Sequence, residues 1–201
     1  MATIASSLFD LPLSAVYDST RWGKAALDVW ASSQSSTAGV AAQVDRRLLS
    51  LVAHAFDASP YYTQLYRKLR VTSNTRLRLG DLPPVTKRSL MAEFDRVVTD
   101  PGLDRKAIDK FVSEPGRLGG ALLGRYAVWT SSGTSGEPGY FVHDPDALAV
   151  YDALEWQRFR GVQSASDLAH QLIAGDRYAM VAAIGGHFAG ISNVERMRRA
   201  M

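Results

Sequence analysis

The sequence predicts an α/β fold in which helices come first, followed by mixed strands and helices. Apolar residues recur at three- and four-residue steps from residue 38 to 58, the period of an amphipathic helix. Two later segments, 125–130 and 140–143, are rich in β-branched and aromatic residues, as strands are. Helices followed by strands interleaved with further helices are typical of α/β or α+β proteins.

The composition is that of a globular protein, and it excludes several functional classes. The chain has 201 residues, of which 46% are hydrophobic and 21% charged, so it can form a sizeable core. The net charge of +3 is too small to indicate a nucleic-acid partner. The absence of cysteine excludes a disulfide scaffold, a thiolate zinc site and a cysteine nucleophile. The four histidines lack metal-ligand spacing, so we expect no protein metal site.

The chain shows no targeting or membrane signal. Residues 1–13 lack the basic start of a secretory signal, and no run of 18 apolar residues occurs. We therefore expect a cytoplasmic protein with no membrane partner.

The first half of the chain is predicted to be mainly helical. Residues 1–37 are interpreted as an N-terminal extension, with a polar loop over 32–37. The helix over 38–58 should bury one apolar stripe, which consists of Val40, Val44, Leu48, Leu51, Val52, Ala55 and Phe56. Ser59 as N-cap and Pro60 at the first helical position predict a new helix to about Leu69.

A connector and two short helices should follow. Residues 70–85 are predicted to be extended, because the double proline Pro83-Pro84 is incompatible with a helix interior. Thr86 should cap a helix through Phe94, and a further helix is expected over 104–112.

In the second half, the expected strands 125–130 and 140–143 flank a loop. Asp144 and Pro145 then predict a helix that ends near Gly161. A weaker helix over 166–173 and a buried strand over 178–184 complete the prediction.

The loop between the two predicted strands has the chemistry of a phosphate site. Its sequence, Ser131-Ser132-Gly133-Thr134-Ser135-Gly136-Glu137-Pro138-Gly139, contains three glycines and four hydroxyl residues. Glycine allows successive backbone N–H groups to line up around an anion, and each hydroxyl adds one donor. Other phosphate-binding and nucleophile motifs do not fit. Arg125-Tyr126 replaces the Lys-Ser/Thr of a Walker loop, and neither GxGxxG nor GxSxG is present.

The loop closely resembles the core phosphate-binding signature of the adenylate-forming (AMP-binding) enzymes. Two earlier segments, Ala58-Ser59-Pro60-Tyr61-Tyr62 and Leu82-Pro83-Pro84-Val85-Thr86-Lys87-Arg88-Ser89-Leu90-Met91, precede it in the order seen in phenylacetate–CoA ligase-like proteins. The resemblance covers about residues 40–190.

The resemblance implies an acyl-activating ligase that joins a small carboxylic acid to the α-phosphate of ATP and then forms a thioester, usually with coenzyme A. Its cofactors would be ATP with Mg²⁺ and coenzyme A. The nucleotide phosphates would be bound by Ser131, Ser132, Gly133, Thr134, Ser135 and Gly136. His187 is a candidate for the acyl pocket, because some relatives carry a histidine or aromatic residue at this place.

The chain also departs from the family pattern. Gly139 stands where many relatives have lysine after the proline, and Glu137 adds a negative charge. The family's ribose-binding aspartate and C-terminal catalytic lysine have no counterpart. Residues 38–201 are therefore interpreted as a partial N-terminal, ATP-binding domain, truncated before the ribose-binding and C-terminal lid regions and expected to be inactive alone. Its partner would be the missing C-terminal portion or a second copy.

An alternative is a shortened, non-catalytic relative that acts as a binding or interaction module. For several other residues, structural interpretations are favoured over functional ones. Lys87 and Arg88 are expected to begin a solvated helix, and Tyr61, Tyr62 and Tyr66 to pack in a core. The basic residues Arg196, Arg198 and Arg199 are expected on an exposed helix face.

Overall fold

A computed structural model describes residues 13–67, 69, 77–131, 133, 138–160 and 186–200. The described part is mostly helical, with one small antiparallel pair of strands, which is compatible with a mixed α/β fold. Contacts group the elements into two units: α1 and α7 form the first, and the remaining helices, most of the two strands and α9 form the second. The division into an N-terminal extension (residues 1–37) and a partial ATP-binding domain (residues 38–201) remains a prediction.

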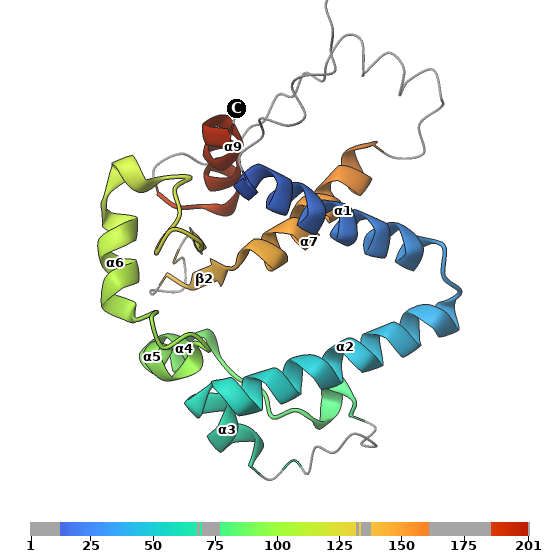
Figure 1. Cartoon of the computed structure of the whole chain (residues 1–201). Helices are drawn as coiled ribbons and strands as arrows, with labels where there is room; N and C mark the ends of the chain where they lie inside the picture. Colours follow the sequence, from blue (N-terminus) through green and yellow to red (C-terminus); the bar gives the residue numbers. More distant parts are fainter. Residues whose placement is uncertain are drawn as a thin grey trace, which may run out of the picture. The chain divides into compact units, whose positions relative to one another are not determined.

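The first unit is a pair of helices, α1 (Leu13–Ser33) and α7 (Pro145–Arg160), which lie side by side in Figure 1. Small residues let the helices approach closely, and the buried residues between them are Ala25, Val29, Ala149 and Ala153. The predicted cap of α7 is confirmed, because the Ala147 amide donates to Asp144 Oδ1 at 2.7 Å.

The end of α1 corrects the predicted loop over 32–37. Ser32 and Ser33 belong to the helix, and their hydroxyls donate to the carbonyls of Asp28 and Trp30, each at 2.7 Å. Serine is compatible with a helix when its side chain bonds back to a preceding carbonyl in this way.

The second unit begins with α2 (Thr37–Ala58) and α3 (Pro60–Tyr66), which share a core. Val52, Tyr66 and Leu77 are its buried centre. The predicted cap at Ser59 is confirmed: its side chain accepts from the Tyr62 amide, and it also donates to the Arg96 carbonyl at 2.9 Å.

The predicted apolar stripe of α2 is only partly buried. Val52 is buried and Leu48, Ala55 and Phe56 are partly buried, but Val40, Val44 and Leu51 are exposed. The predicted burial of Val40, Val44 and Leu51 is wrong, because no described element covers these side chains.

Three further helices contribute four of the other buried apolar residues of this unit. They are α4 (Lys87–Ala92), α5 (Phe94–Val97) and α6 (Arg105–Ser113). Thr86 caps α4, as predicted, and Asp104 caps α6. The buried apolar residues are Met91, Phe94, Leu103, Ile108, Phe111, Leu122, Val128 and Trp129.

Two predictions in this region need correction. The single helix expected through Phe94 is interrupted at Glu93, whose backbone leaves the helical region. The connector that was predicted to be extended contains a 3-10 turn, η2 (Leu79–Asp81), in which the Asp81 carboxylate accepts from the Arg78 amide at 2.8 Å. A second 3-10 turn, η3 (Pro115–Arg117), follows α6.

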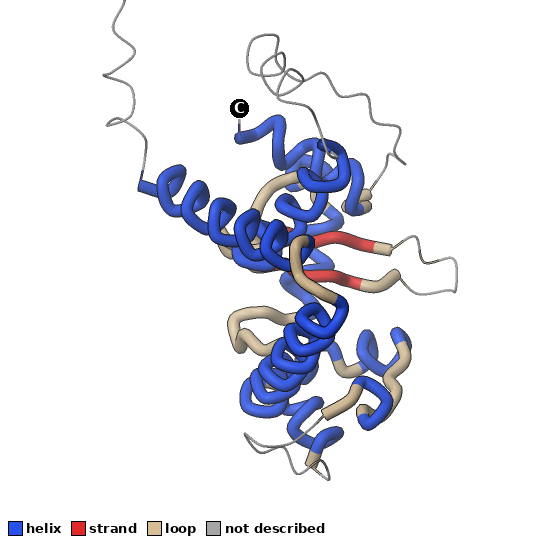
Figure 2. Tube along the Cα trace, turned by 90° about the vertical axis from the view of Figure 1, so that its right-hand side faces the viewer, coloured by secondary structure: helices blue, strands red, loops and turns tan. Residues whose placement is uncertain are grey.

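Two short strands, β1 (Ala127–Thr130) and β2 (Tyr140–His143), lie side by side in Figure 2. The predicted β2 is confirmed, and β1 begins two residues later than its predicted start at Arg125. Thr130 also forms a parallel bridge with Phe188, just before α9 (Ala189–Ala200).

The helix predicted over 166–173 and the strand over 178–184 lie outside the described residues. The basic residues of α9 do lie on a helix, with Arg198 and Arg199 exposed. Within the described ranges, none of the helices combines the length and apolar character needed to cross a bilayer.

A candidate phosphate-binding loop

The base of the loop is closed by two hydrogen bonds between Ser131 and Gly139. The Ser131 amide donates to the Gly139 carbonyl at 2.9 Å, and the Gly139 amide donates to Ser131 Oγ at 2.7 Å. The Ser131 hydroxyl therefore acts as an acceptor inside the protein, while its own hydrogen can still be donated to a ligand. The pairing places the two ends of the loop next to each other, as the strand–loop–strand prediction requires.

Of the other predicted phosphate-binding residues, the structure describes Gly133. Its φ of +66° lies in the left-handed region, which glycine adopts without steric cost. This is a conformation that can turn backbone N–H groups toward an anion. Ser132, Thr134, Ser135 and Gly136 lie outside the described residues.

The second strand is anchored to the helices at Tyr140, immediately after the loop. The Tyr140 hydroxyl donates to Asp109 Oδ1 at 2.5 Å, and the Arg105 guanidinium lies 4.7 Å from the centre of its ring. Burial raises the pKa of Tyr140, and the bond to Asp109 raises it further. The Tyr140 amide also donates to Met91 Sδ at 3.4 Å. These contacts hold one end of the loop against α4 and α6.

Ser131→Ala is expected to lower the free energy of unfolding by about 1–3 kcal/mol, because it leaves the buried Gly139 amide without its acceptor. Urea unfolding would measure the loss. Ser113→Ala is a matched control, since it removes an exposed hydroxyl at the end of α6 and should change stability by no more than about 0.5 kcal/mol. Equal losses in both variants would contradict the role given to Ser131.

His187 lies beside the strand that leads into the loop. Its carbonyl accepts from the Thr130 amide at 2.7 Å, and its ring packs 5.2 Å from that of Phe111. The side chain is 3% exposed, and Nε2 has no hydrogen-bond partner among the described residues. Burial lowers the pKa of His187, an effect that a hydrogen bond with the Val128 backbone partly offsets. A role in an acyl pocket remains a prediction.

The lowered pKa of His187 predicts that stability decreases in mild acid. Below the ordinary histidine pKa of about 6.5 the unfolded chain takes up a proton more readily than the folded one, so the free energy of unfolding falls as the pH falls. His143, whose pKa burial also lowers, acts in the same direction. His187→Phe should therefore reduce this pH dependence without abolishing it. Urea unfolding between pH 7 and pH 5 would measure it, and an unchanged slope would contradict the prediction.

Lys87 begins α4, as expected, but its side chain is half-buried rather than fully solvated. Its Cδ lies 3.2 Å from the position that a Cβ at Gly139 would take. Arg88 is exposed, as expected. No sequence signal distinguishes the two, because the contact depends on where α4 packs.

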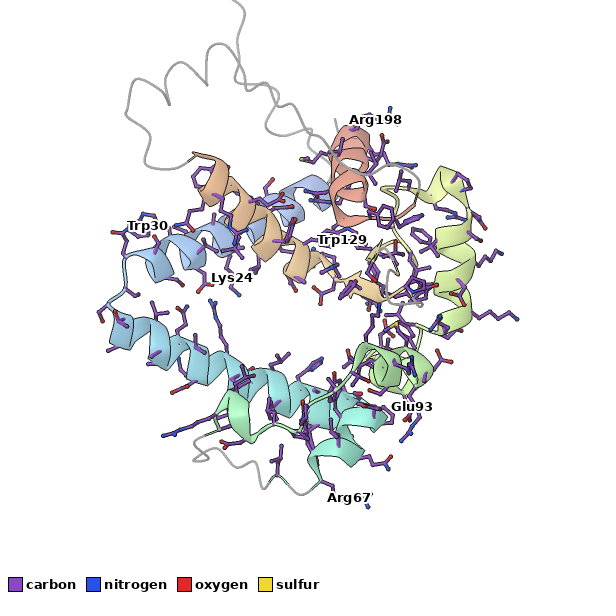
Figure 3. All side chains as sticks on the ribbon, turned by 180° about the vertical axis from the view of Figure 1, so that it is seen from behind. Lys24, Trp30, Arg67, Glu93, Trp129 and Arg198 are labelled. Atoms are coloured by element: carbon purple, nitrogen blue, oxygen red, sulfur yellow. The ribbon has the colours of Figure 1, made fainter. Side chains whose placement is uncertain are left out.

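A shallow polar cavity of about 510 Å³ lies elsewhere in the same unit, where α2 meets α3. Arg67, which follows α3 and is labelled in Figure 3, lines this cavity. Glu93, also labelled there, belongs to the neighbouring segment between α4 and α5. Arg96, which also lines the cavity, is already bonded to Glu93 and to Gln64 Oε1. Its guanidinium is therefore engaged by protein groups.

Among the residues that the structure describes, no three acidic or histidine side chains gather closely enough to hold a metal ion. Comparisons of the chain with protein-family models, curated proteins and solved structures return no match.

Proposed function

We propose that this chain contains the ATP phosphate-binding part of an acyl-activating ligase. The observation that carries the proposal is the glycine- and hydroxyl-rich loop between paired strands, closed at its base by Ser131 and Gly139 and carrying Gly133 at positive φ. In this role the loop holds the β- and γ-phosphates of ATP while the carboxylate attacks the α-phosphate. Its amides and hydroxyls stabilise the charge that develops on the departing pyrophosphate.

The remaining components follow from the sequence resemblance. The substrates are a small carboxylic acid and ATP with Mg²⁺, and the acceptor is a thiol, usually coenzyme A. His187 borders the acyl group, and its buried Nε2, which has no hydrogen-bond partner among the described residues, gives that pocket one polar atom. The proposed location is the cytoplasm, and a further catalytic portion or a second copy is the proposed partner.

Calorimetric titration of the purified chain with three probes tests the phosphate-binding role. Mg²⁺-ATP and pyrophosphate should bind, because both carry the adjacent phosphates that the loop contacts. AMP should bind at least tenfold more weakly, since it lacks the β- and γ-phosphates (about 1.4 kcal/mol per tenfold change). Absence of binding by both ATP and pyrophosphate would overturn the proposal, as would equal affinity for ATP and AMP.

Acid-dependent exchange of pyrophosphate into ATP, measured with the chain joined to the proposed further catalytic portion, then distinguishes a ligase from a binding module. A ligase catalyses exchange with at least one carboxylic acid, whereas a non-catalytic relative binds ATP without exchange.

A further inference from the structure

The helix α9 is docked on the second unit by contacts at both of its ends. Just before the helix begins, the Thr130 amide donates to the His187 carbonyl at 2.7 Å, and Thr130 forms its bridge with Phe188. Near the other end, Arg199 Nη2 donates to the Gly116 carbonyl at 2.8 Å. These contacts join the helix to β1 and to the turn η3.

Little buried apolar surface holds α9 in this position. Among the residues of the helix that the structure describes, the buried side chains are those of Ser192 and Asn193, which are polar. The larger apolar residues are half-buried or exposed, and they are Ile191, Val194 and Met197. Because segments with few buried apolar contacts open locally before the core does, α9 should open more readily than the rest of its unit.

His187 is the buried side chain at the start of this docked segment. It is 3% exposed, and its ring lies 5.2 Å from that of Phe111 on α6. The ring forms a hydrogen bond with the Val128 backbone, and its Nε2 has no partner among the described residues. A proton taken up at Nε2 would create a charged N–H group in this buried position, where charge is disfavoured. The docked arrangement therefore favours a neutral ring.

The charged groups on the elements around His187 do not stabilise a charge on its ring. Asp109 and Glu114 on and after α6 bond to other side chains, and Glu195 on α9 pairs with Arg198. Lys110 is exposed, β1 carries no charged side chain, and β2 ends at His143, whose pKa burial also lowers. Among the described residues, no charged group contributes to the pKa of His187, which burial lowers and the bond with Val128 raises.

We propose that His187 is a pH-dependent latch, which keeps α9 docked on β1 and α6 while its ring is neutral and releases the helix when its ring is protonated. Opening breaks the bond between Thr130 and His187 and lets the imidazolium reach water. It uncovers the Phe111 ring and one edge of β1, while the core of the unit stays folded. The open form gains population as the pH falls below about 6.5, the ordinary value for histidine.

Hydrogen exchange of the full chain, read by mass spectrometry of its peptides and corrected for the intrinsic rate at each pH, measures the opening. Peptides from α9 should open at least about tenfold more often than peptides from the core of α2 and α3. Between pH 7 and pH 5 the open fraction of α9 should rise by about 5- to 25-fold, because one titrating group shifts an equilibrium by at most tenfold per pH unit.

Matched substitutions assign the pH response to one histidine. His187→Gln removes the titrating group and keeps an amide that can donate to the Val128 backbone, so the open fraction of α9 should change less than about twofold over the same range. His187→Phe removes the titrating group and keeps an aromatic ring beside Phe111, and it should behave in the same way. His54→Gln makes the first of these changes at an exposed histidine of α2 and should retain the full response.

The ratio of open fractions at the two pH values is taken within each variant, so a variant that is less stable at every pH still reports the response. Three results would overturn the latch. In the first, α9 and the core of α2 and α3 are equally protected, so the helix does not open by itself. In the second, the open fraction of α9 in the wild-type chain is the same at pH 7 and pH 5. In the third, both His187 variants retain the rise, which would assign it to another group.

Discussion

Gly119→Ala should destabilise the protein by about 2–5 kcal/mol, the sum of backbone strain and overpacking. A Cβ at this position would lie 2.6 Å from the backbone carbon of Glu195 and 2.7 Å from the Arg196 amide nitrogen, both in α9. These are backbone atoms, so relief requires a shift of the helix. The φ of Gly119 is also +72°, which side-chain-bearing residues rarely adopt.

Gly124 provides a matched control. Its φ of +70° is nearly the same, but a Cβ there would meet no atom within 4 Å. Gly124→Ala should therefore cost only the strain of the left-handed conformation, about 1–2 kcal/mol. Urea unfolding of both variants measures the difference. If the two variants lost equal stability, α9 would not pack closely on the turn that contains Gly119.

Thr134→Ala should slow acid-dependent exchange of pyrophosphate into ATP by roughly 30- to 1000-fold in a complete ligase, in which this chain is joined to the proposed further catalytic portion. Thr134 lies outside the described residues, and the expectation comes from the loop's hydroxyl chemistry. Removing one donor to charge that develops in a transition state costs about 2–4 kcal/mol, by comparison with the loss of one oxyanion-hole donor. The fold should survive, because a surface loop contributes few buried contacts.

One variant is a control for this measurement: Ser50→Ala removes an exposed hydroxyl from α2 and should leave the exchange rate unchanged. A second variant, Glu137→Lys, should change ATP binding in the opposite direction and tighten it, because it replaces a negative charge beside the phosphates with a positive one. A normal melting temperature together with a wild-type exchange rate in Thr134→Ala would show that the loop is not the phosphate site.

Local signals predicted the helix starts well. Ser59, Thr86 and Asp144 each accept a hydrogen bond from an amide three residues later, as the sequence predicted. An N-cap depends on atoms within one turn of chain, so it needs no knowledge of packing. The same holds for β2, whose aromatic and β-branched residues and flanking turn residues mark both of its ends.

Local signals were less informative where two interpretations compete. The serines at the end of α1 favour a loop by composition, but they bond to helix carbonyls instead. The periodicity of α2 predicted a single buried face, but only Leu48, Val52, Ala55 and Phe56 on that face are covered. Periodicity identifies the apolar face of a helix but does not identify the element that packs on it.

The sequence by itself determined the loop, its glycines and hydroxyls, the lack of a cation within it, and the caps of the helices around it. Only the tertiary structure brought Lys87 to Gly139, fastened Tyr140 to Asp109 and Met91, and set His187 beside β1. Each of these contacts joins residues that lie far apart in the chain. Their formation depends on the packing of α4, α6 and α9 against the strands, which is decided by the shared core and not by the residues that neighbour each side chain in the sequence.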